Sequence, residues 1–361
     1  MNKEDTLWQI RWPDGRKEYK VHQENTELEL YIEYRLKENQ VTVLSCKGFG
    51  TVVTVPDFIK GYPVIGIGAY AFSDSGKGLA LLPEESEVFY EKIAGIRVPG
   101  SREETLSGRR LKEITLPKHL KVIEKYAFYN CRELERVKFN PVNFNSVNLN
   151  PGRLCIENGA FMNCDKLKDI KVNGTPEEET AAREILMELD SELCVTYSHG
   201  EEIGMFLFPD YYEYSIENTP ARITQELLYG AGYRYRQCFR EGILDVPVYD
   251  EVFQSAEIQT LHETALRIAF LRLQYPYGLL EKPKERYLNF ISTHIQKALN
   301  YMILRDDIKG LGFLSGLGLM SERNYIEAQE EAVRLGRGEC AGLLLKERLL
   351  MYPPTEKEYD F

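Results

Sequence analysis

A short phrase recurs three times in the first half of the chain and limits what the chain can fold into. Each copy holds an alanine–phenylalanine pair and an isoleucine four residues before the alanine. The three pairs begin at Ala71, Ala127 and Ala160. A unit this short cannot bury an apolar face alone, so its repetition predicts that neighbouring copies stack and bury each other. Repeat architectures present surfaces to partners more often than they build active sites.

The spacing of the copies predicts parallel strands in register. Leu111 and Leu134 open two units 23 residues apart, and Leu167 opens a third that we expect to remain incomplete. The alternation in residues 114–116 predicts a short strand with one buried face, and Pro117 ends it because proline lacks the N–H donor. Stacking at about 4.8 Å then aligns equivalent side chains. The predicted ladders are Leu111/Leu134/Leu167, Ile67/Ile123/Ile156 and Phe72/Phe128/Phe161.

The stretch from Leu111 to Cys131 resembles the BspA-type leucine-rich repeats almost letter for letter. Residues 41–64 are similar to the hairpin and first repeat that open such arrays, so the resemblance covers about residues 41–172. It implies a short β-solenoid. It implies little about function, because one fold serves many functions.

The chain divides into five predicted segments. Alternation over residues 28–36 and a turn at residues 37–40 predict a hairpin that caps the first repeat. Thr175-Pro176 and Thr219-Pro220 each predict the start of a helix, and strands are expected at residues 193–197 and 204–208. The segments are an N-terminal β cap (1–40), a leucine-rich repeat solenoid (41–175), a mixed connector (176–254), a helical repeat-like domain (255–352) and a tail (353–361).

Helical periodicity dominates from about Ser255 onward. Apolar stripes predict helices over residues 258–273, 288–302, 306–320, 321–335 and 339–350. Residues 325–345 are similar to the helix pair of an ankyrin repeat, but the Thr-Pro-Leu-His opening is missing, so a generic α-solenoid is an equal alternative. The predicted fold class is therefore α+β, a capped β-solenoid followed by an α-helical domain.

Composition excludes some classes of function. The chain has 45 Lys and Arg against 56 Asp and Glu, a net charge of −11, which argues against general affinity for nucleic acid or anionic membranes. Apolar runs are too short for a membrane-spanning helix. The N-terminus lacks a secretory layout, and seven scattered cysteines are typical of reduced thiols, so we expect a cytoplasmic protein.

The sequence offers little catalytic or metal-binding chemistry. His262-Glu263 lacks a second histidine at ligand spacing, and Ser198-His199-Gly200-Glu201 is typical of a turn satisfied by its own polar groups. The glycines of residues 310–318 fit neither a Rossmann motif nor a P-loop, and they indicate close helix packing instead. We therefore expect no cofactor and no metal.

Two surfaces are candidates for binding a protein. An aromatic and basic cluster near residues 211–236 could contact a partner, form the seam between the two halves of the chain, or stack on nucleic acid; its candidate residues are Tyr233, Arg234, Tyr235 and Arg236. The second surface is the outward face of the strands. There Glu113, Arg136 and Asp169 are expected to align, and Thr115 is expected to align with the candidates Lys138 and Lys171; a simple solvated face is the alternative.

These patterns favour a non-catalytic scaffold of the bacterial cytoplasm that binds another protein. One alternative is an enzyme with its site in a cleft between the solenoid and the helical domain, near residues 197–240. Another is an exported surface-binding protein. The sequence leaves the partner and the oligomeric state open.

Overall fold

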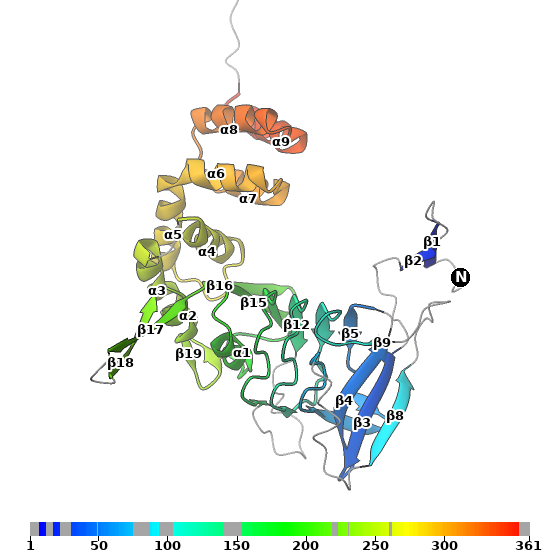
Figure 1. Cartoon of the computed structure of the whole chain (residues 1–361). Helices are drawn as coiled ribbons and strands as arrows, with labels where there is room; N and C mark the ends of the chain where they lie inside the picture. The colour runs from blue at the N-terminus through cyan, green and yellow to red at the C-terminus, as the bar shows by residue number, and fades with distance from the viewer. Residues whose placement is uncertain are drawn as a thin grey trace, which may run out of the picture. The chain divides into compact units, whose positions relative to one another are not determined.

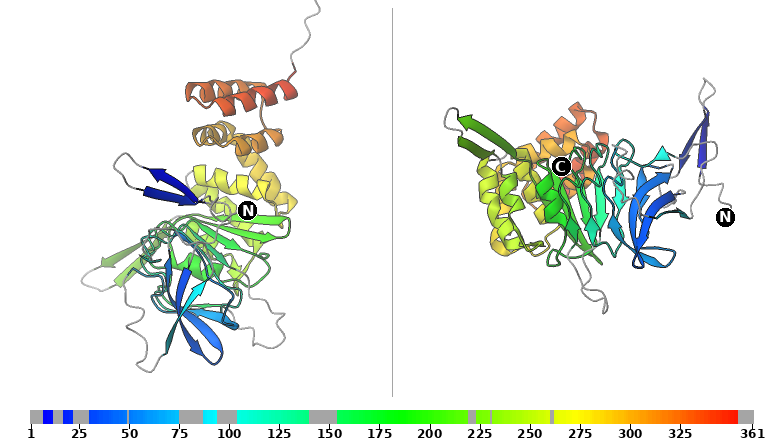
Figure 2. Two further views of the ribbon diagram at one scale, coloured as in Figure 1. Left: turned by 90° about the vertical axis from the view of Figure 1, so that its right-hand side faces the viewer. Right: turned by 60° about the horizontal axis from the view of Figure 1, so that its bottom comes forward.

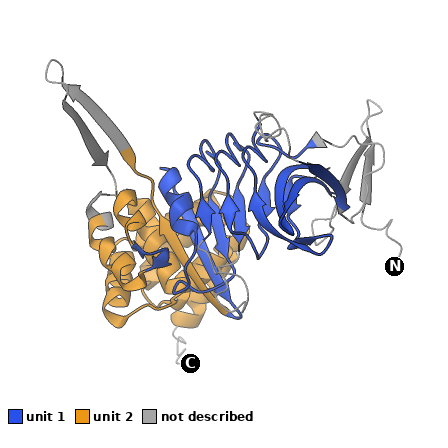
Figure 3. Cartoon of the chain, turned by 90° about the horizontal axis from the view of Figure 1, so that it is seen from below, with its two compact units in different colours: residues 1–201, 239–244 blue, residues 202–238, 245–361 orange. Residues whose placement is uncertain are grey.

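The computed structural model of the chain describes residues 7–11, 17–21, 30–48, 50–74, 87–93, 104–139, 154–218, 223–229, 231–259 and 262–353. The chain forms two compact units (Figure 3). Unit 1 comprises residues 1–201 and 239–244, and unit 2 comprises residues 202–238 and 245–361. Each unit is described separately below.

A ladder of parallel strands runs through unit 1 (Figure 1). Its register pairs Ile114 with Val137 and Val137 with Ile170, as the 23-residue spacing predicts. The third unit keeps its opening strand but not the rest of the repeat phrase, and the next strand of the chain extends the ladder by pairing Val195 with Ile170. The strands in order are β5 (Val52–Thr54), β10 (Glu113–Thr115), β12 (Arg136–Phe139), β14 (Asp169–Val172) and β15 (Leu193–His199).

A second, mixed sheet lies on the other side of the repeats. Ile67, Ile123 and Ile156 align in its parallel part, and the predicted hairpin turns at Glu38 and Asn39, whose φ angles are 52° and 58°. The sheet order is β13 (Cys155–Ile156), β11 (Val122–Ile123), β7 (Tyr62–Ile67), β4 (Gln40–Gly48), β3 (Leu30–Lys37) and β8 (Val88–Ile93), with β6 (Phe58–Ile59) on β7 and β9 (Glu104–Thr105) on β4. A further hairpin joins β1 (Leu7–Arg11) to β2 (Lys17–Val21).

The segment between Gly76 and Arg110 contributes two strands to this sheet. Strand β8 pairs with β3, and β9 pairs with β4. Strand β3 also departs from simple alternation, since Glu33 is buried between β4 and β8. Its carboxylate accepts hydrogen bonds from Lys47 Nζ at 2.7 Å and from the Tyr90 hydroxyl.

A stack of phenylalanine rings forms the core of the repeats. Phe72, Phe128 and Phe161 are fully buried, with ring centroids 5.1 Å and 4.8 Å apart along the stack. Each backbone N–H of the first two donates to the alanine carbonyl of the next repeat at 2.8 Å. The thiols of Cys131 and Cys164 donate to the carbonyls of Phe72 and Phe128 at 3.2 Å and 3.3 Å. The recurring Ala-Phe and Cys positions are therefore explained by contacts between neighbouring repeats.

Helix α1 (Ala182–Glu188) ends the phenylalanine stack. The carboxylate of Glu188 accepts from the N–H groups of Ala160 and Phe161 at 3.2 Å and 2.7 Å, in place of the carbonyl that a further repeat would supply. The predicted helix start at Pro176 is wrong. Thr175 N–H instead donates to the Glu178 carboxylate at 2.7 Å in a turn, which satisfies the backbone locally. Strands β19 (Phe239–Arg240) and β20 (Ile243–Leu244) complete unit 1.

Unit 2 is mainly helical, as the periodicity predicts. The prediction of a helix after Thr219-Pro220 is wrong, because Ile223–Tyr229 forms strand β18, which pairs with β17 (Tyr212–Asn218). The stripe over residues 288–302 is divided at His294 into two helices. The elements are β16 (Glu202–Phe208), α2 (Gly232–Arg236), α3 (Val246–Gln259), α4 (His262–Gln274), α5 (Glu281–Thr293), α6 (Ile295–Leu304), α7 (Ile308–Gly316), α8 (Glu322–Arg334) and α9 (Gly338–Met351).

A buried ion pair joins three helices in the core of unit 2. Arg272 on α4 and Asp250 on α3 are 0% and 1% exposed, and the guanidinium binds both carboxylate oxygens at 2.8 Å and 3.0 Å. The Tyr287 hydroxyl of α5 donates to the same carboxylate at 2.8 Å, and the guanidinium lies 4.7 Å from the ring centroid of Phe206. Desolvation by burial, reinforced by the nearby Asp250 charge, raises the pKa of Tyr287 well above its ordinary value. The network fixes how the three helices pack.

Candidate interaction surfaces

The outward side of the parallel ladder forms a regular surface that we call the ladder face. Strand alternation buries Val53, Ile114, Val137, Ile170 and Val195 and turns their neighbours outward. The register aligns the outward residues in two rows. The rows are Val52/Glu113/Arg136/Asp169/Cys194 and Thr54/Thr115/Lys138/Lys171/Thr196.

Charged side chains of the ladder face are held by one another. Arg136 lies between two acids, with Nη1 2.5 Å from Glu113 Oε1 and Nη2 2.9 Å from Asp169 Oδ2, so the expected alternation of sign is confirmed. Lys138 Nζ lies 3.5 Å from Glu113 Oε2, so an acid diagonal to it offsets the neighbouring Lys171. In the part of the chain that the structure describes, Lys171 has no ion-pair partner.

The ion pairs of the ladder face hold its charged side chains in place but contribute little to the free energy of folding. Their side chains are 26–37% exposed, and pairs this accessible contribute about 0–1 kcal/mol each. The strands below them are fixed by backbone hydrogen bonds and the buried ladder. The face is therefore preorganised, with Lys171 and the hydroxyls of Thr115 and Thr196 available to a bound group.

The aromatic and basic cluster does not form one surface. Tyr235 and Arg236 are 0% exposed, so the hypothesis that they bind a partner is wrong. Arg236 donates to the carbonyls of Pro209 and Gly232 and lies 4.8 Å from the ring centroid of Tyr211. In the same way, the Tyr235 ring packs 4.7 Å from that of Tyr249 inside unit 2.

The other two residues of the cluster remain accessible. Tyr233 is half-buried against Tyr211, and Arg234 is exposed and donates to Ser255 Oγ at 2.6 Å. The short helix α2 therefore divides the four residues between core and surface. Neighbouring positions on a helix point in different directions, which the sequence cluster alone does not reveal.

Residues of the histidine, serine and glycine motifs make local contacts. Ser198 Oγ donates to the Val172 carbonyl at 3.5 Å, and His262 Nδ1 lies 2.9 Å from Lys297 Nζ. Gly310 lies in the first turn of α7, where its N–H donates at 2.8 Å to the capping carboxylate of Asp307. Across the described ranges, no three His, Cys, Asp or Glu residues are grouped in a way that could hold a metal ion.

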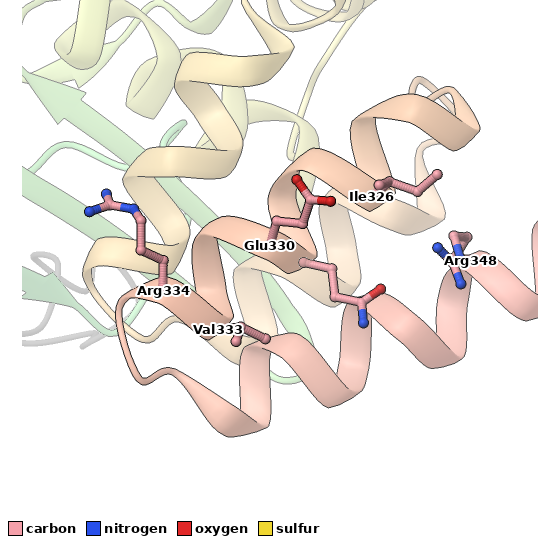
Figure 4. A pocket seen from close by; sticks show the side chains of 6 residues that line it. Ile326, Glu330, Val333, Arg334 and Arg348 are labelled. Carbon is pink, nitrogen blue, oxygen red and sulfur yellow. The ribbon is translucent and has the colours of Figure 1, made fainter.

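A shallow groove on α8 and α9 is a further candidate that sequence analysis missed (Figure 4). Its volume is about 430 Å³, and its lining residues are Ile326, Gln329, Glu330, Val333, Arg334 and Arg348. Ile326 and Val333 lie beside the buried stripe of Tyr325, Ala328 and Ala332. Two apolar residues seven apart lie on one side of a helix, so the sequence does contain a signal for this groove. The neighbouring buried stripe already accounts for the amphipathic pattern of the helix, so the sequence alone gives no reason to expect a second apolar side.

In-register strands and stacked phenylalanine turns define a repeat protein. Residues 102–178 match a family model described as "BspA type Leucine rich repeat region (6 copies)", so this part of the chain is a BspA-type leucine-rich repeat region. No curated protein and no solved structure matches the chain. None of the helices in the described residues is both long enough and apolar enough to span a membrane.

Proposed function

We propose that the protein is a non-catalytic scaffold of the bacterial cytoplasm that binds another protein through the ladder face. The observation that carries this proposal is the preorganised double row of side chains on a repeat ladder. Leucine-rich repeats generally mediate protein–protein interaction, and stacked repeats supply extended surfaces. In this proposal the ladder is a short β-solenoid capped by the β3–β4 hairpin, and the helices form an ankyrin-like or α-solenoid domain.

The chemistry of the ladder face favours an acidic partner segment. Arg136 is already neutralised by two carboxylates, whereas Lys171, which has no ion-pair partner among the described residues, offers its ammonium beside the Thr196 position. A carboxylate of the partner would pair with Lys171, and its neighbouring polar groups would bond to the threonine hydroxyls. Charge complementarity of this kind chiefly sets partner choice and association rate.

Two observations support the parts of the proposal that concern catalysis and compartment. The hydroxyls of Tyr197 and Tyr235, in the region named for a possible enzyme site, are fully buried, and burial raises the pKa of both, so they stay protonated. None of the seven cysteines forms a disulfide, and most of them are buried. A reducing compartment suits cysteines that form no disulfide.

Charge reversal on the ladder face tests the proposal. Tagged protein would be recovered from the native host, and bound proteins quantified by mass spectrometry, for the wild type and for Lys138→Glu with Lys171→Glu. The matched control is Lys125→Glu with Lys166→Glu, which makes the same change of charge at exposed residues off the face. We expect a partner that the control retains and the ladder-face variant loses. Equal recovery by both variants would contradict binding at this face.

A further inference from the structure

Helices α8 and α9 form a layer of unit 2, and no other helix or strand among the described residues packs on its outer side. Helix α8 packs on α6, and α9 packs on α7, so the α8–α9 layer covers the α6–α7 layer (Figure 2). Each helix uses one buried stripe for this, formed by Tyr325, Ala328 and Ala332 on α8 and by Cys340, Ala341 and Leu344 on α9. A layer of stacked repeats that faces water normally presents a polar outer side.

Large apolar residues occupy this outer side instead. Ile326 and Val333 on α8 are 37% and 65% exposed, and Leu345 and Leu349 on α9 are 37% and 45% exposed. The spacing of seven on α8 and four on α9 places each pair on one side of its helix. Gly342 lies one turn before Leu345, and an added Cβ there would meet nothing within 4 Å. We call the surface formed by these residues and the groove of Figure 4 the end face.

Among the described residues, the end face carries one charge of each sign that has no ion-pair partner. Glu330 on α8 and Arg348 on α9 both line the groove, and neither has an ion-pair partner among the described residues. Arg334, the other cation of the groove, is already bound to Glu331, with Nη2 2.5 Å from Oε1. An occupant of the end face must therefore supply an apolar centre, one cation and one anion.

We propose that the end face binds the end face of a second copy of this chain about a two-fold axis. In a two-fold interface every contact occurs twice, so Glu330 of each copy pairs with Arg348 of the other while the four apolar side chains bury one another. A second copy supplies both charges in the required positions. A partner with charges of a single sign would leave one buried charge unpaired, which is costly. This inference is independent of the ladder face.

Sedimentation velocity and light scattering on the whole protein, over roughly 1–100 μM, test the proposal. We expect the mass of two chains for the wild type and for Lys138→Glu with Lys171→Glu. Val333→Glu and Leu349→Glu each place a charge at an already exposed position, and each should weaken dimerisation about tenfold or more. Leu280→Glu, at a residue that is 58% exposed before α5, is the matched control and should remain dimeric.

A charge-swap experiment tests the pairing itself. Glu330→Arg alone and Arg348→Glu alone each place like charges opposite one another twice, so each should be monomeric. An equimolar mixture of the two variants restores both opposite-charge pairs and should form the heterodimer. A monomeric wild type, a dimer that Val333→Glu leaves intact, or a mixture that stays monomeric would each overturn the proposal.

Discussion

Truncation of the central ring of the phenylalanine stack should destabilise unit 1 more than truncation of either end ring. Phe128 is fully buried and stacks on two rings, at 5.1 Å and 4.8 Å, whereas Phe72 and Phe161 each stack on one ring of the series. Buried Phe→Ala substitutions cost about 3–5 kcal/mol, and each aromatic pair contributes about 0.5–1.5 kcal/mol. We expect Phe128→Ala near 5 kcal/mol and each end variant about 1 kcal/mol less.

A loss of this size approaches the whole stability of a domain, so a milder variant is needed beside it. Phe128→Leu keeps most of the apolar volume and loses the two ring contacts, with an expected cost of about 1–2 kcal/mol. Because the two units need not unfold together, the assay is hydrogen exchange of the Phe72 and Phe128 amides, which donate along the stack. In each variant, the hydrogen-exchange rates of both amides should rise by the factor that corresponds to the lost free energy of unfolding.

The control for this series is Met162→Ala, next to the stack but 47% exposed, with an expected cost below about 1 kcal/mol. If Phe128→Ala costs no more than this control, or less than Phe161→Ala, the rings do not form one continuous core.

Three further predictions concern polar side chains: the buried ion pair of unit 2, and Glu188 and Glu33 of unit 1. Asp250→Ala leaves the Arg272 charge buried without its partner and should cost unit 2 about 3–5 kcal/mol in urea unfolding, whereas Asp250→Leu with Arg272→Met should recover most of it. Glu188→Ala removes the acceptor of the buried Phe161 N–H, while the Ala160 N–H keeps the Glu157 carbonyl at 3.2 Å, and should cost unit 1 about 1–3 kcal/mol, read as faster exchange of the Phe161 amide. Glu33 should stabilise unit 1 fully above pH 4.5, its ordinary pKa, and progressively less as the pH falls through its lowered folded pKa, measured as unfolding free energy against pH.

The direction of the pH dependence predicted for Glu33 follows from competing effects on the pKa of its carboxylate. Burial is the largest effect and raises its pKa, but the hydrogen bonds from Lys47 and Tyr90, together with the Lys47 charge, outweigh it and lower the pKa below 4.5. Glu33→Gln should therefore flatten the acid limb of the pH dependence. An unchanged acid limb would contradict the assignment. The Asp250 prediction would be contradicted if Asp250→Leu with Arg272→Met were no more stable than Asp250→Ala. The Glu188 prediction would be contradicted if Glu188→Gln were as unstable as Glu188→Ala.

The repeats were predictable because their periodicity is set by contacts between identical residues. The spacing of Leu111 and Leu134 fixes the register, and the recurring Ala-Phe pair fixes the stack. The same reasoning did not predict the end of the repeats, where contacts without the repeat phrase take the place of a further repeat. Strand β15 continues the ladder without the repeat phrase, and Glu188 replaces a backbone carbonyl with a side chain.

Failures outside the repeats arose where tertiary pairing overrides local signals. Thr219-Pro220 has the pattern of a helix start, yet the residues that follow pair as a strand with β17. The buried partners of Asp250, Arg272 and Tyr287 lie on three separate helices, so no spacing along the chain reveals them. For the candidate site, the rows of the ladder face followed from register, whereas burial of Tyr235 and Arg236 depended on the packing around α2.

Site-specific photo-crosslinking in cells tests most directly whether the ladder face binds the partner. A photoreactive amino acid would replace Thr115 or Lys171 on the face, and Lys125 or Lys166 away from it, one position at a time. Our account predicts that both face positions crosslink to the same protein and that the other two positions do not. Crosslinks to that protein from Lys125 or Lys166, with none from the face, would contradict the account.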